Sequence, residues 1–131
     1  MIKTKSVATK IDRKKDGLRI LVARGRGRGL PADRYDVWMA NLGPSEELLG
    51  SYLSGKIGWD QYAQRYTREL RESDRLDRHN KNIRNHGQKF TLRLLQHLGT
   101  HQNVTLLCHC AEDERHCHRH VLQDLLSQPI K

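Results

Sequence analysis

The side chains best able to do chemistry lie close together near the end of the chain. The thirteen residues from Cys108 to His120 hold all three cysteines of the protein, four of its eight histidines and two arginines. Thiolates and imidazoles are the ligands that zinc prefers in proteins, and a cysteine thiolate is also a nucleophile. The segment therefore suggests a metal site, a reactive cysteine or a structural cluster.

A metal site would use four soft donor atoms, those of Cys108, Cys110, Cys117 and His118. The first two would share one face of an extended strand end, and the other two follow after six residues. His116 and His120, four positions apart at a helix start, form an alternative pair. The spacing matches none of the usual zinc patterns, such as two C-x-x-C motifs, so zinc is a hypothesis that depends on how the chain folds.

A reactive cysteine would need surroundings that lower the pKa of its thiol. Cys117 is predicted to lie at the start of a helix beside His118 and Arg119, where the helix end and the cations favour the thiolate. These three are the candidate catalytic residues. The stretch from Cys110 to Arg115 resembles the C-x5-R loop of phosphatases and rhodanese-like enzymes, but it is one residue shorter and carries three acids that would repel phosphate.

A structural explanation is also open. Cys108 continues an apolar strand and could be a buried small hydrophobe. His109, on the opposite face of that strand, could be a core histidine, and the remaining histidines could be exposed. This explanation suits single residues better than a cluster of three cysteines, four histidines and two arginines.

Two apolar runs are predicted to be the strands that position these residues. Residues 18–23 form a short run with branched side chains, and residues 24–31 contain three glycines and a proline, which predict a loop. Residues 103–108 form the second strand and lead into the cysteine segment. Residues 35–39 could add a third strand. A strand that runs into a glycine-rich loop is a common place for an anion site.

Helical periodicity appears in the stretches between the strands. Four segments are predicted to be helices: one that follows the N-cap residue Ser45 and ends at Gly50 or Gly55, one at 59–70, one at 90–98 and one at 121–126. Gly99 is expected to end the third of them. Residues 75–85 are polar and could be a fraying helix or a loop.

The alternation of strands and helices predicts an α/β fold with a parallel pair of strands joined by a long crossover. The length of 131 residues supports a single domain. We expect it to span residues 18–131, after a basic segment, residues 1–17, that forms an edge strand or a tail. Ligands in such folds bind beyond the carboxyl ends of the strands, which favours a site in the loops that follow them.

Positive charge is concentrated in the first quarter of the chain. The protein has 24 Lys and Arg against 15 Asp and Glu, a formal charge of +9, and residues 1–34 hold eleven of these cations against three Asp. The asymmetry suggests an anionic small molecule or nucleic acid as partner, or a solubilising segment. Residues 1–34 contain no aromatic residue for base stacking, and no helix-turn-helix, zinc-finger or RNP motif supports sequence-specific readout.

Composition argues against several classes of protein. No uncharged apolar run approaches the ~18 residues of a membrane span, so we expect no integral membrane placement. The first fifteen residues are basic but have no apolar core, so we expect no secretory signal. Three cysteines cannot pair completely, which together with the missing signal predicts a reducing cytoplasm rather than a disulfide scaffold.

Several segments, taken in order, match the motifs of one protein family. The strand Val104–Cys108, followed by Cys117-His118-Arg119 at the start of a Leu-rich helix, resembles the DUF488 family. Three further segments are similar to its YeaO-like branch: Leu21–Arg24 with Arg28–Leu30, Asp36–Trp38 with Pro44-Ser45, and Trp59–Leu70. The resemblance covers roughly residues 18–127. It implies a small, cytoplasmic, Rossmann-like domain with a short, mostly parallel sheet flanked by helices, but it supplies no reaction.

Two departures from the family pattern affect the first loop. Ala23 stands where the family usually has an Asp, which removes an acid from that position. The apolar residues usual before Arg-Gly are replaced by Gly25-Arg26-Gly27, which makes the loop more basic and more flexible. YeaO-like members also often lack cysteines in the C-terminal loop, so the resemblance does not imply a metal.

The resulting hypothesis is a pocket for a small or anionic ligand between two loops, Arg24–Gly29 and Cys108–Arg119. Arg24, Arg28 and Arg119 are expected to surround it, because planar guanidinium groups suit carboxylate and phosphate. Whether the pocket is enzymatic stays open. The alternative is a non-enzymatic nucleic-acid-binding protein that uses the basic N-terminal quarter.

Overall fold

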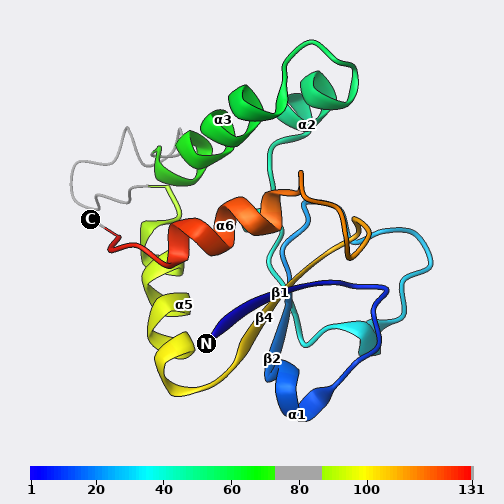
Figure 1. Ribbon diagram of the computed structural model, residues 1–131, viewed down its shortest axis with the longest axis vertical. Helices are drawn as coiled ribbons and strands as arrows, with labels where there is room; N and C mark the ends of the chain where they lie inside the picture. The colour runs from blue at the N-terminus through cyan, green and yellow to red at the C-terminus, as the bar shows by residue number, and fades with distance from the viewer. Residues whose placement is uncertain (73–86, 131) are drawn as a thin grey trace.

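A four-stranded parallel sheet forms the centre of the molecule (Figure 1). The computed structural model describes residues 1–72 and 87–130. The strands are β1 (Ile2–Ser6), β2 (Leu18–Leu21), β3 (Val37–Trp38) and β4 (Val104–Cys108), in the order β1-β4-β2-β3. The predicted α/β fold, with its parallel pair and short third strand, is confirmed. The polar stretch 75–85 lies outside the described residues.

β4 lies inside the sheet and is buried along its whole length. Its sequence, VTLLC, is the continuous apolar run expected of a strand that is covered on both faces. β1 pairs with it on one side, with Ser6 opposite Cys108, and β2 on the other, with Leu21 opposite Leu107. Residues 2–6 of the basic segment thus form an edge strand. Because the strands are parallel, the chain leaves all of them at one end of the sheet.

Helices connect the strands and cover the sheet. They are α1 (Arg13–Asp16), α2 (Glu46–Leu53), α3 (Trp59–Arg71), α5 (Lys89–His101) and α6 (His118–Leu126), with two 3-10 turns at Ala32–Arg34 and Ala40–Leu42. The Ser45 Oγ accepts a hydrogen bond from the Leu48 N–H at 3.2 Å, as predicted for the N-cap of α2. No helix in the described ranges is both long and apolar enough to span a bilayer.

One predicted helix end is wrong. α5 continues past Gly99 to His101. A Cβ on Gly99 would come within 2.7 Å of the Ile2 side chain, so this glycine lets β1 pack closely against the helix and does not end it. Of the two glycines considered for the end of α2, Gly50 lies inside the helix and Gly55 lies in the turn after it, with a φ of +80°.

Alternate residues of the inner strands pack on opposite faces of the sheet. Ile20 and Leu106 belong to a large core shared with α2, α3, α5 and α6. The smaller core on the other face consists of Val7, Leu21, Ala23 and Leu107, and the loop after β2 covers it. Figure 1 shows α3, α5 and α6 grouped on one side of the sheet.

Part of the basic N-terminal quarter is used inside the fold. The buried Asp16 carboxylate accepts hydrogen bonds from Lys5 Nζ at 3.0 Å and from the buried Arg19 guanidinium. Arg34 donates to two backbone carbonyls in the loop after β1. These three side chains therefore stabilise the fold around β1 and β2, and their charge is not simply displayed to a polyanion.

Candidate functional site

The loops that follow β2 and β4 lie side by side at the carboxyl end of the sheet. His109 Nε2 is 3.0 Å from the carbonyl oxygen of Gly25, which joins the two loops directly. Gly27 has a φ of +89°, and a Cβ there would lie 2.7 Å from the His109 ring. The close approach thus needs a glycine. His109 is exposed in this position and is not part of the core.

Three sulfur atoms and one imidazole nitrogen gather where these loops meet α6. Cys108 Sγ lies 3.9 Å from Cys110 Sγ and 3.8 Å from His118 Nδ1, and Cys117 Sγ lies 4.0 Å from the same nitrogen. The donor atoms of Cys108, Cys117 and His118 all lie within 4.8 Å of one another, and these three residues are buried. The fold therefore brings three of the four hypothetical metal ligands into one group, and places the fourth, Cys110, beside Cys108.

A backbone hydrogen bond fixes the orientation of the His118 ring. Its Nε2 is 2.8 Å from the carbonyl oxygen of Val22, at the end of β2. A carbonyl only accepts hydrogen bonds, so the proton sits on Nε2 and the lone pair of Nδ1 faces the sulfur atoms. Burial lowers the pKa of His118, which keeps the ring neutral. The Tyr66 ring packs edge-on against it, with centroids 5.5 Å apart.

The protonation of the three thiols is shared. The hydrogen bond from the Cys108 thiol, followed by the one from Cys117, lowers the pKa of Cys110 to about 2. The same interactions raise the pKa of Cys108 and Cys117, and burial raises them further. These interactions therefore favour the thiolate form at Cys110 over Cys108 and Cys117. A metal that bound all three sulfur atoms would displace two protons.

The arrangement fits a tetrahedral metal ion. Zinc with Zn–S bonds of about 2.3 Å and a Zn–N bond of about 2.0 Å holds its ligand atoms about 3.5–3.8 Å apart. The three separations given above, from 3.8 to 4.0 Å, are close to that range. The backbone hydrogen bond of His118 is the kind of support that metal-binding histidines commonly have. Cys108, Cys117 and His118 could therefore hold a metal ion, with the Cys110 sulfur 3.9 Å from that of Cys108.

The alternative histidine pair is held elsewhere. His116 stacks on the Trp59 ring of α3, with centroids 4.7 Å apart and planes inclined by 12°. His120 Nε2 lies 3.0 Å from the carbonyl oxygen of Glu114. Neither ring joins the sulfur cluster in the described structure.

Arg119 holds the backbone of the cysteine loop. Its side chain is fully buried, and its two Nη atoms donate to the carbonyl oxygens of Cys110 at 3.2 Å, Ala111 at 2.9 Å and Glu112 at 3.2 Å. Its Nε has no hydrogen-bond partner within the part of the chain that the structure describes. The guanidinium thus clamps the turn that presents Cys110 to the cluster.

The three arginines named as anion ligands occupy different surroundings. Arg24 lines the cavity described below, and its guanidinium donates to the carbonyl oxygens of Pro44 and Gly43, both at 2.7 Å. Arg28 is exposed and does not line that cavity, and Arg119 lies buried behind the loop. The structure therefore brings only Arg24 to the cavity wall.

A cavity of about 620 Å³ opens over the sulfur cluster. The two loops form one side of it, and all four cluster residues contribute to its wall. The apolar and aromatic part of the wall consists of Pro44, Leu49, Tyr52, Leu53 and Tyr62. The rings of Tyr52 and Tyr62 stack with centroids 4.6 Å apart. No sequence pattern predicts that α2 lines this cavity, because periodicity does not show which neighbour a half-exposed helix face meets.

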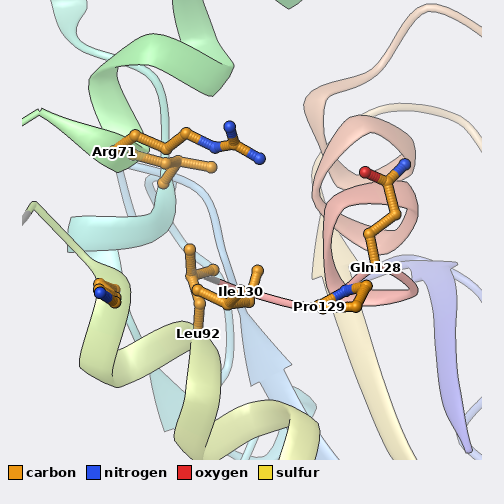
Figure 2. Close-up of a pocket in the computed structure, with 7 residues that line it drawn as sticks. Arg71, Leu92, Gln128, Pro129 and Ile130 are labelled. Carbon is orange, nitrogen blue, oxygen red and sulfur yellow. The ribbon is translucent and has the colours of Figure 1, made fainter.

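A second cavity, of about 460 Å³, lies between α3, α5 and the C-terminal segment (Figure 2). Arg71, Leu92, Gln128, Pro129 and Ile130 are among its lining residues. Its described walls contain no cysteine, histidine or acid. This second cavity therefore offers no candidate metal ligand or nucleophile among its described residues.

Comparison with known proteins gives a family and no close relative. The family model DUF488-N3a, described as the active DUF488-N3 subclade, matches residues 2–129. The chain therefore belongs to the DUF488 family. No curated protein and no solved structure matches it. The match does not bear on the likeness to the YeaO-like branch.

Proposed function

We propose that this DUF488 protein is a zinc-dependent domain that binds a small ligand in the cavity over its metal. Cys108, Cys110, Cys117 and His118 would ligate the ion, and the Arg24–Gly29 loop and α2 would enclose the ligand. The observation that carries the proposal is the convergence of the Cys108 and Cys117 sulfur atoms on the free lone pair of His118, at 3.8 and 4.0 Å, with the Cys110 sulfur 3.9 Å from that of Cys108. The description of the subclade as active agrees with a site that carries out a reaction.

The donor set favours zinc over other metals. Three thiolates and one imidazole in a tetrahedral arrangement suit zinc, whereas Mg²⁺ and Ca²⁺ prefer oxygen ligands. Zn²⁺ with three thiolates and a neutral imidazole carries a net charge of −1. The Arg119 guanidinium, bonded to the carbonyl oxygen of Cys110, supplies a nearby positive charge that offsets it.

The ligand class follows from the cavity walls. A volume of about 620 Å³ suits a small molecule, and the apolar side would contact a flat or aliphatic group. The wall carries one arginine, Arg24, and one acid, Glu114, and we assign the expected carboxylate or phosphate of the ligand to the side of Arg24. The nucleic-acid alternative has no comparable support, because Lys5, Arg19 and Arg34 of the basic quarter bond within the fold.

Metal analysis of the purified protein tests the proposal. We expect about one zinc per chain by mass spectrometry after purification without metal-affinity resin. Cys117→Ser and His118→Ala should lose most of this zinc. His116→Ala, which alters an exposed ring in the same loop, should retain it and serves as the matched control. Wild-type protein that holds no zinc after incubation with excess zinc and gel filtration would overturn the proposal.

A further inference from the structure

We infer that Cys110 is the reactive ligand of this centre and accepts an alkyl group from a small electrophile that enters the cavity. The inference rests on the zinc site proposed above. Its starting observation is a difference in exposure among the four ligands. Cys108, Cys117 and His118 are 4%, 2% and 6% exposed, whereas Cys110 is partly exposed and lines the cavity.

The position of Cys110 is set by neighbours and does not depend on an unrestrained loop. Its carbonyl oxygen accepts a hydrogen bond from Arg119 at 3.2 Å, and its Sγ lies 3.9 Å from that of Cys108. The sulfur atom is thus held at the boundary between the buried cluster and the open cavity. A closed structural zinc site would bury all its sulfur atoms, and this one leaves Cys110 more exposed to the cavity than the other three residues.

The chemistry of such a ligand is nucleophilic substitution. Bound zinc would keep the Cys110 sulfur as thiolate at neutral pH, and three thiolates would leave the centre with a net charge of −1, which would keep electron density on sulfur. The Cys110 Sγ attacks an electrophilic carbon, the new S–C bond forms, and the bond from carbon to the leaving group breaks. The leaving group departs as an anion with the electron pair. No proton, oxidant or reductant is required, and the product is a thioether on Cys110.

The cavity selects the electrophile. Besides the cluster, the cavity is lined by Leu49, Leu53 and the stacked rings of Tyr52 and Tyr62. These walls would hold an aliphatic or aromatic group while its reactive carbon faces the sulfur. Leu53 is 74% exposed at the cavity wall and would contact an apolar molecule on its way in. The substrate class is therefore a small alkyl or benzyl electrophile with a good leaving group.

The same geometry argues against the other two cysteines as the site of attack. Cys117 lies at the N-cap of α6, where a reactive thiol was expected, but its side chain turns into the cluster and is 2% exposed. Cys108 ends the central strand and is buried as well. An electrophile in the cavity would meet Cys110 before either of them.

Alkylation of the zinc-loaded protein by benzyl bromide, mapped by peptide mass spectrometry, tests the inference. Zinc is measured on the same samples. We expect Cys110 to be modified at least about tenfold faster than Cys108 or Cys117. Leu49→Trp should narrow the cavity and slow labelling of Cys110 about fivefold or more, with zinc content unchanged. Leu94→Trp, at an exposed position on α5, is the matched control and should label like wild type.

The outcomes separate the two proposals. Zinc at one per chain with selective labelling of Cys110, slowed by Leu49→Trp, supports the inference. Zinc at one per chain with equal labelling of the three cysteines, or labelling only after a chelator removes the metal, overturns the inference and leaves the zinc site standing. A protein without zinc overturns the zinc site, and the inference fails with it.

Discussion

The Nε2 of His118 donates a hydrogen bond to the carbonyl oxygen of Val22, 2.8 Å away and 96 positions earlier in the chain. This bond ties the start of α6 to the end of β2. It also decides which ring nitrogen carries the proton, and so leaves Nδ1 free to face Cys108 and Cys117. The chain at the end of β2 holds no proposed metal ligand itself, but through this bond it orients His118.

Removal of the His118 ring should weaken metal binding strongly. In His118→Ala we expect zinc affinity to fall more than about 100-fold, because both a ligand and its oriented lone pair are lost. His118→Cys should recover part of the affinity, since a thiolate can complete a four-sulfur site. Competition with a chromophoric chelator measures both. Equal affinities of His118→Ala and the wild type would contradict the role of this nitrogen.

The hydrogen bonds of Arg119 to the cysteine loop should contribute to the stability of the fold. Arg119→Met would leave three loop carbonyls without their donor, and we expect a loss of about 3–5 kcal/mol in the free energy of unfolding. Arg115→Met, at an exposed position in the same loop, should change it by less than about 0.5 kcal/mol. Urea unfolding of the zinc-loaded proteins measures the difference. Similar losses in the two variants would show that the clamp is not needed.

Asp16 should give the protein an acid-sensitive component of stability. Burial alone would raise the pKa of Asp16, but the hydrogen bonds from the Asp12 N–H and Lys5, with the charge of Arg19, outweigh it and lower the pKa below 3.8. The folded state therefore binds this proton less readily than the unfolded state. The stabilisation is present above pH 3.8 and is lost as the pH falls through the folded-state pKa.

The substitution Asp16→Asn tests whether the Asp16 carboxylate supplies this acid-sensitive stability. We expect it to cost about 3–5 kcal/mol at neutral pH, because Arg19 stays buried without its anion. The gap between wild type and variant should shrink as the pH falls below 3.8, and the comparison cancels any acid release of metal. Asp33→Asn, at an exposed carboxylate, is the control. A gap that is independent of pH would exclude this carboxylate as the titrating group.

The close approach of the two loops at Gly27 should be visible in a matched pair of variants. Gly27 and Gly29 both have positive φ, but a Cβ would meet the His109 ring only at Gly27, since nothing lies within 4 Å at Gly29. Both alanine variants should lose about 1 kcal/mol to backbone strain. Gly27→Ala should lose about 1 kcal/mol more and shift the NMR signals of the His109 ring. Identical behaviour would mean that the loops do not touch there.

The two inner strands of the sheet could be predicted from the sequence. The mainly apolar runs at 18–23 and 103–108 predicted the inner strands, since a sheet covered on both faces favours such segments. Local patterns failed where a neighbour decided the outcome. Gly99 could not be recognised as a packing residue, because its partner, Ile2, is far away in the chain.

The residues of the candidate site could be predicted from the sequence, but the positions of their side chains could not. The density of soft ligands pointed to Cys108, Cys110, Cys117 and His118, but their spacing is unusual, because the sheet and α6 bring them together. An N-cap side chain can fold over its helix or turn away from it, and Cys117 turns away. An arginine in the first turn can face a cavity or a loop, and the sequence did not indicate that Arg119 faces the loop.

Zinc K-edge X-ray absorption of the purified, zinc-loaded protein measures the proposed ligand set most directly. We predict three sulfur atoms at about 2.3 Å and one nitrogen at about 2.0 Å. Cys110→Ala should lose one of the three sulfur ligands, whereas His116→Ala should leave the spectrum unchanged. A spectrum dominated by oxygen and nitrogen ligands, with no sulfur near 2.3 Å, would contradict the Cys3His centre.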